Sequence, residues 1–126
     1  MAESVTWMYS ARALRGPSVG SSGTLEVDAY QKINVTLPTG GAAQQVTIGP
    51  GTWAELSAVV ISASDLGGVV DVTPDGGNTF PLDGPLVLIG AGPVSLLGAG
   101  DATVELLNNG AADVDVDIFV ARDATP

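Results

Sequence analysis

The chain has 126 residues, which suits a single domain that buries roughly two-thirds of the surface of its unfolded chain. It contains no cysteine and no histidine, which excludes disulfide bonds, thiolate nucleophiles, the usual zinc sites and Ser-His-Asp triads. Fourteen acidic residues against four basic ones give a formal net charge of −10, and so acidic a surface repels phosphate backbones and anionic membranes. We therefore expect no nucleic-acid binding and no membrane binding.

The N-terminal segment, Ser4 to Leu14, combines aromatic side chains with basic ones. Trp, Tyr and Arg are the residue types that dominate the energetics of protein interfaces. They make this segment the candidate partner-binding site, formed by Trp7, Tyr9, Arg12 and Arg15. The segment also lacks the basic start and unbroken apolar stretch of a signal peptide, so we expect a protein that is soluble when synthesised in the cytoplasm.

Residues 16–23 read GPSVGSSG, a composition typical of a flexible spacer. Two interpretations of the N-terminus stay open: an ordinary first strand followed by a loop, or an arm that leaves the domain and lies on another subunit. We favour a division into an arm with its linker, residues 1–23, and a β-sandwich domain, residues 24–126.

From Thr24 onward the chain consists of short apolar–polar alternations separated by turns rich in glycine and proline. About nine or ten short strands at this spacing predict an all-β fold, an antiparallel β-sandwich of jelly-roll-like type. Residues 69–73 are expected to pair back on residues 52–63 as a hairpin, and Pro81 and Pro85 indicate edge strands because proline cannot donate to a ladder. The expected strands after the arm cover residues 24–29, 30–37, 45–48, 52–63, 69–73, 79–82, 85–89, 94–97, 103–107 and 113–122.

The most apolar segment is Thr52 to Ala63. Its cluster of β-branched residues and its flanking glycines and prolines favour a strand over a helix. We expect it to be buried on both faces, with a core contribution from Trp53, Leu56, Ala58, Val60 and, in addition, Val59 and Ile61.

The last ordered part, Thr103 to Arg122, is predicted to be an antiparallel hairpin. Its turn, Asn108-Asn109-Gly110, contains residues that tolerate positive φ. In the second strand, apolar residues alternate with aspartates, so one face is apolar and the other is acidic. The apolar face is formed by Val114, Val116, Ile118 and Val120, and the acidic row by Asp113, Asp115 and Asp117.

The acidic row resembles the start of a calcium loop, D-x-D-x-D, but Ile118 and Ala124 occupy the positions that need glycine and glutamate. On a strand the three carboxylates stand ~7 Å apart, so we expect a solvated face that blocks edge-to-edge aggregation, and no metal. Weak calcium binding at Asp75 and Asn78 stays open beside their ordinary role in a turn. No cofactor and no catalytic constellation is indicated, and we expect a protein that is not an enzyme.

The short N-terminal arm VTWMYSARALRG, the Gly/Ser hinge and the acidic β-domain ending in VDIFVARDATP give the chain a layout that resembles capsid decoration (cement) proteins and related minor virion proteins of tailed bacteriophages. This resemblance implies a structural virion protein on the capsid exterior that binds the major capsid protein between its subunits, as a homo-oligomer and frequently a trimer.

Two other functions stay open. One is a carbohydrate-binding or host-attachment module, in which Trp53 or Phe80 would contact the sugar. The other is a cytosolic acidic β protein that inhibits a basic partner.

Overall fold

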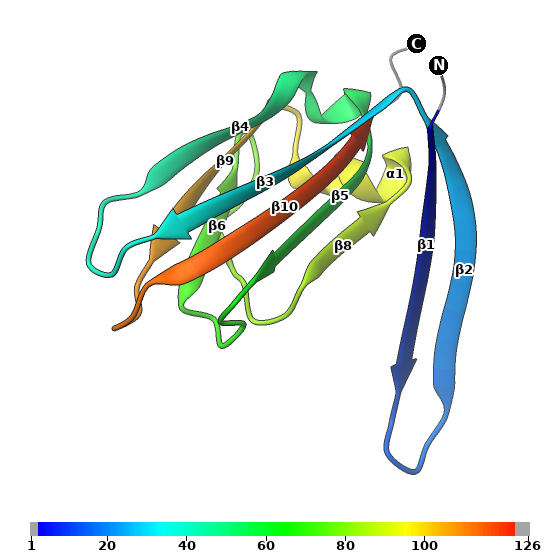
Figure 1. The fold of residues 1–126 in the computed structure, drawn as a ribbon, viewed down its shortest axis with the longest axis horizontal. Coiled ribbons are helices and arrows are strands. Elements are labelled where there is room, and N and C mark those ends of the chain that lie inside the picture. The colour runs from blue at the N-terminus through cyan, green and yellow to red at the C-terminus, as the bar shows by residue number, and fades with distance from the viewer. Residues whose placement is uncertain (1–2, 123–126) are drawn as a thin grey trace.

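The computed structural model describes residues 3–122 and confirms the expected all-β sandwich. Two four-stranded antiparallel sheets face each other, and a two-stranded hairpin stands beside them (Figure 1). The ten strands are β1 (Glu3–Arg12), β2 (Ser18–Val27), β3 (Ala29–Leu37), β4 (Gln44–Thr52), β5 (Leu56–Ala63), β6 (Val70–Pro74), β7 (Phe80–Pro81), β8 (Leu86–Ile89), β9 (Asp101–Asn108) and β10 (Val114–Arg122).

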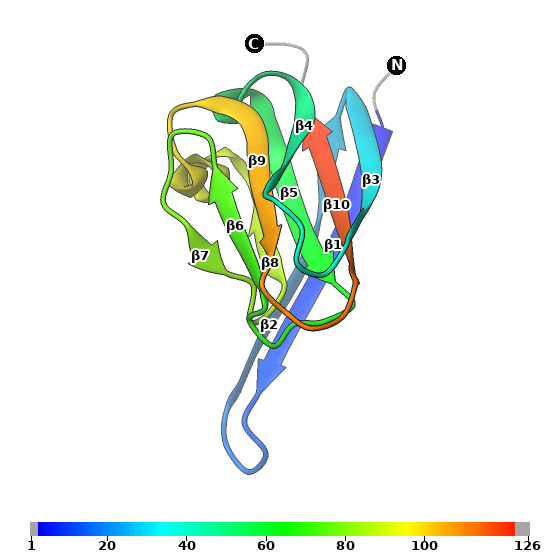
Figure 2. The ribbon, with the colours of Figure 1, turned by 90° about the vertical axis from the view of Figure 1, so that its left-hand side faces the viewer.

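The first sheet has the strand order β3-β10-β5-β8 and the second has the order β4-β9-β6-β7. The view in Figure 2 separates the two layers, with β10 and β5 on one side and β9 and β6 on the other. Among the connections between consecutive sandwich strands, only the one from β6 to β7 stays within a sheet. All the others cross from one sheet to the other.

Two of the expected hairpins are therefore wrong. β9 pairs with β4 and β6, whereas β10 pairs with β3 and β5, so these two strands do not pair with each other. Likewise, β6 does not pair back on β5. The chain between β9 and β10 is long enough to span the ~10 Å between packed sheets, and the crossing lets both strands turn their apolar faces inward.

The connection after β9 is held by a side chain and not by unusual backbone angles. Asn108 is buried, and its amide donates hydrogen bonds to the carbonyls of Leu37 (3.0 Å) and Ala112 (2.9 Å). Its side-chain oxygen accepts a hydrogen bond from the Gly110 amide. None of Asn108, Asn109 and Gly110 has a positive φ, so the expected reason for the turn is also wrong.

Helical turns differ from the expectation at two places: one forms the start of an expected strand, and the other replaces an expected strand. Trp53–Glu55 is a 3-10 turn (η1) that precedes β5, and residues 94–97 lie in a helical segment, α1 (Ala91–Val94) followed by η2 (Ser95–Leu97). Pro93 fits the first turn of a helix, and the spacing of the buried Val94 and Leu97 is helical. Within the described part of the chain, no helix has the length and the apolar character needed to cross a membrane.

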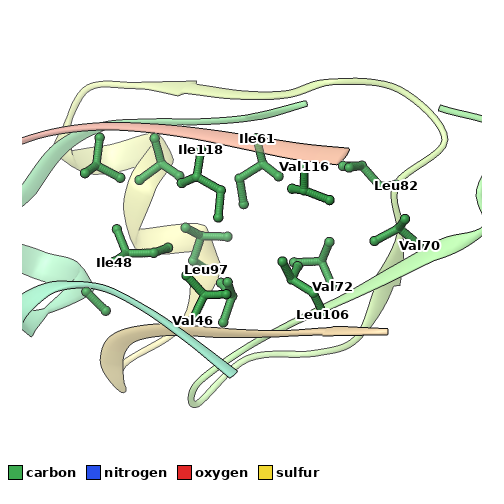
Figure 3. Close-up of a cluster of buried hydrophobic side chains, with 14 of the residues drawn as sticks. Val46, Ile48, Ile61, Val70, Val72, Leu82, Leu97, Leu106, Val116 and Ile118 are labelled. Carbon is green, nitrogen blue, oxygen red and sulfur yellow. The ribbon is translucent and has the colours of Figure 1, made fainter. Parts of the chain in front are cut away.

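The core lies between the two sheets. Ile61, Val116 and Ile118 of the first sheet face Val72 and Leu106 of the second (Figure 3). The alternation predicted for residues 114–120 is confirmed, because its four apolar side chains are all buried. β7 and β8 are each at one edge of their sheets, as the prolines indicate, and β3 and β4 form the opposite edges.

Candidate protein-interaction surface

The N-terminal segment is one long β-hairpin. β1 and β2 pair antiparallel over their full length, from Glu3 opposite Val27 to Arg12 opposite Ser18, and hydrogen bonds between Ala13 and Pro17 and between Gly16 and Ala13 close the turn. The expectation of a flexible spacer at residues 16–23 is wrong, because these residues form part of the turn and most of β2. Small residues suit β2, since the bulky side chains of β1 occupy the space above them.

The base of the hairpin is attached to the outer face of the first sheet, the face that points away from the core. Val27 packs with Ala58 of β5 and Ala121 of β10 in a small second cluster, and the Asp28 amide donates to the Arg122 carbonyl at 3.0 Å. The half-buried members of this cluster are Val5, Leu25, Ile89 and Phe119. Beyond this base the hairpin leaves the body, and its turn projects past the sandwich in both views (Figures 1 and 2).

Trp7 and Tyr9 lie on the hairpin face that is turned toward the body. Their rings stack, with centroids 6.2 Å apart and planes 12° apart. Trp7 lies over Gly23 of β2: a β-carbon at Gly23 would come within 2.6 Å of Trp7 Cζ2. Between these rings and the body is an open apolar groove of about 400 Å³, whose far wall is formed by Val87, Ile89 and Pro93.

Arg12 and Arg15 do not join the two aromatic residues. Alternation along β1 places Arg12 on the opposite face of the hairpin together with Met8, and Arg15 lies in the turn. Both arginines are exposed, and neither makes an ion pair with any residue in the range 3–122. The structure thus divides the four predicted site residues between an aromatic inner face and a basic outer face and tip.

The exposed large hydrophobic side chains of the described residues gather around the hairpin. Met8 is 82% exposed and Leu14 is 92% exposed, fractions that are costly unless a partner covers them. Of the others, Tyr9 and Val19 lie on the hairpin, Tyr30 lies near the start of β3, Val87 lines the groove, and Leu96 lies in η2. Composition alone missed Val19 and Leu96, because the segments containing them had been assigned to a spacer and to a strand.

The outer face of the first sheet has two distinct halves. Near the hairpin it is mostly apolar: the rows that contain Tyr30 and Phe119 include one charged residue, the exposed Lys32 opposite Phe119. At the far end it is acidic, and we call this part, with Asp115 and Asp117 at its centre, the acidic half. Asp115 accepts a hydrogen bond from Thr36 at 2.7 Å, and Asp117 accepts one from Asn34 at 2.8 Å. Asp113 accepts one from the Thr39 amide.

The remaining candidate residues have structural contacts. Asp75 accepts a hydrogen bond from the Asp101 amide, and its carbonyl accepts one from Trp53 Nε1 at 3.1 Å. Trp53 is fully buried, so it offers no surface for a sugar ring. Phe80 packs against the core. Among residues 3–122, no group of three or more acidic side chains converges as a metal site would require.

No protein-family model, no curated protein and no solved structure matches this chain. The interpretation of the hairpin therefore depends on its own geometry and charge.

Proposed function

We propose that the chain is a structural protein that decorates the outside of a bacteriophage capsid and attaches to the major capsid protein through the hairpin β1–β2. The observation that carries this proposal is the hairpin itself. It extends apolar and basic side chains beyond an acidic body, and Met8, Leu14 and Arg15 lie exposed on it. Exposed apolar patches of this kind mark interaction sites in soluble proteins.

The way in which the hairpin is attached also supports a docking role. A pair of ten-residue strands that projects from a domain gains little stability from its own core, since an isolated two-stranded hairpin is at best marginally stable. Here the cluster around Val27 holds only the base. The distal part would gain most of its order by binding a partner, and several hairpins on one oligomer would multiply the affinity for a repetitive shell.

We also propose that the sandwich is a jelly roll. The support is the strand order: with the sandwich strands counted from β3, one sheet reads 1-8-3-6 and the other 2-7-4-5. Two four-stranded sheets with crossing connections are the architecture of many capsid and lectin domains. The step from this fold to a capsid is an analogy, because one fold serves many functions.

A carbohydrate-binding or host-attachment role is the second candidate. The aromatic rings of Trp7 and Tyr9 beside the groove, whose planes are nearly parallel, are the feature that favours it, since sugar rings stack on aromatic surfaces. Binding on a glycan array that is lost in Tyr9→Ala would support this candidate over the first.

Shortening the hairpin tests the proposed function. Residues 6–24 are replaced by Asn-Gly, a two-residue turn that reconnects Val5 to its partner Leu25 and keeps the attachment cluster. We expect the full-length chain to co-sediment with purified phage particles, and we expect the shortened variant to fold but to lose this co-sedimentation. Retained co-sedimentation would exclude the hairpin as the attachment element, and absence of the full-length chain from the particles, measured by mass spectrometry, would exclude the virion role.

A further inference from the structure

We propose that the hairpin also joins copies of this chain to one another: the distal half of the hairpin in one copy docks on the acidic half of the first sheet in the next. The inference rests on the proposed role of the hairpin as a docking element, but it does not require a capsid. The partner that occupies the acidic half is a second copy of the chain. Charge, side-chain spacing and hydrogen-bonding capacity each favour that partner.

Charge is the first argument. Residues 6–24 contain Arg12 and Arg15 and no acidic residue, whereas residues 28–126 contain twelve of the fourteen acids and two basic residues, Lys32 and Arg122. Within one copy the two charges are far apart, because β10 begins at the end of the sandwich opposite to the hairpin (Figure 1). The arginines of one copy can therefore meet the acidic half only on another copy.

The spacing of side chains on the two surfaces also matches. On the outer face of the hairpin, Met8 and Arg12 are four residues apart on one strand, and on the body Phe119 and Asp115 are four residues apart on β10. Each separation spans about 13 Å along a strand. A hairpin laid along β10 can place Met8 on the apolar half while Arg12 reaches Asp115.

The acidic half has unused hydrogen-bonding capacity. Thr36 and Asn34 bond only the Oδ1 atoms of Asp115 and Asp117, and no residue in the described range donates to either Oδ2 atom. A guanidinium group can donate to such an oxygen in a charge-assisted bond. Ser10 and Gly20, which lie opposite each other between Met8 and Arg12, leave room for close approach.

The contact has a defined symmetry, because the hairpin and the acidic half are different surfaces. Such a contact closes into a two-fold dimer when two copies exchange hairpins reciprocally, and otherwise closes into a larger ring or continues as a chain. The hairpin also acts as a spacer. It joins bodies of high negative charge without placing their surfaces against each other.

Charge reversal on the two sides tests the proposal in purified protein. One variant carries Arg12→Glu and Arg15→Glu, and a second carries Asp115→Arg and Asp117→Arg. Each alone is expected to associate at least about tenfold more weakly than the parent in sedimentation velocity at low salt. A mixture of the two is expected to associate again. The acidic hairpin of the first variant then meets the basic sheet of the second, and the basic hairpin of the second meets the acidic sheet of the first.

The matched control variant carries Asp83→Arg and Glu105→Arg, which reverse the charge of two exposed acids outside the first sheet. It is expected to associate as strongly as the parent. Circular dichroism confirms that each variant is folded. A parent chain that stays monomeric at its solubility limit, or a mixture that does not associate, overturns the inference. If self-association fails in this way but phage particles bind the parent and not the variant with the shortened hairpin, the proposed function is still supported.

Discussion

The indole ring of Trp7 lies directly over the α-carbon of Gly23 on the neighbouring strand, in the space where any other residue would place a side chain. Gly23→Val is therefore expected to displace the ring and to open the groove beside Val87. With fluorine-labelled tryptophan, the NMR resonance of Trp7 should move toward its solvent-exposed position while that of the buried Trp53 stays in place.

Gly84→Ala is the control for this substitution, because a β-carbon at Gly84 meets nothing within 4 Å. It should leave both resonances unchanged. An unmoved Trp7 resonance in Gly23→Val would show that the ring does not depend on this glycine.

Asn108→Ala is expected to destabilise the sandwich by roughly 1–3 kcal/mol, because it leaves two carbonyls and a buried amide without their partner. Urea unfolding followed by circular dichroism measures the change. Asn109→Ala, at an exposed neighbour whose side chain bonds only Asp71, should cost at most about 0.5 kcal/mol. Equal losses from the two variants would contradict the role assigned to Asn108.

Trp53→Phe tests whether the tryptophan is a core residue. The substitution removes the hydrogen bond to the Asp75 carbonyl and leaves a small cavity, so we expect a loss of roughly 1–3 kcal/mol in the free energy of unfolding. Self-association should not change, because Trp53 is remote from both proposed surfaces. A stable variant with altered binding would mean that the side chain is functional and not structural.

Asp117→Asn should slightly stabilise the protein. The amide oxygen can still accept from Asn34, and repulsion with Asp115, about 7 Å away along the strand, is removed. The loss of the attraction between Asp117 and the exposed Lys32, its diagonal neighbour, offsets part of this gain. We expect a gain of roughly 0.2–0.5 kcal/mol at low salt. At ~1 M salt the gain should vanish, because the screening length falls to about 3 Å. Asp83→Asn, which removes the same charge from a loop, should show no comparable gain.

Much of the fold followed from local patterns. The period-two alternation of residues 114–120 identified the buried face of β10, and the positions of Pro81 and Pro85 identified two edges. Pairing partners did not follow, because alternation fixes which side of a strand is buried but not which strand lies beside it. The short segment between β9 and β10 fits a hairpin and a crossing equally well.

The candidate site was predicted in part. Aromatic and basic residues at positions 7–15 indicated an interaction segment, but GPSVGSSG has the composition of a linker. Its strand conformation depends on a partner, since β propensity reflects the neighbouring strand more than the residue itself. The split between the Trp7 face and the Arg12 face appears only once the segment is known to be a strand.

The order of the strands also bears on how the chain folds as it is synthesised. β3 and β4 each hydrogen-bond to a single strand of the sandwich, and these partners are β10 and β9, the last two strands among the described residues. Neither sheet can assemble before β9 and β10 have been synthesised. The hairpin β1–β2, whose contacts are local, can form much earlier, and long-range pairing of this kind is slow. The hairpin, which we propose as the docking element, can thus form before the domain that carries it has folded.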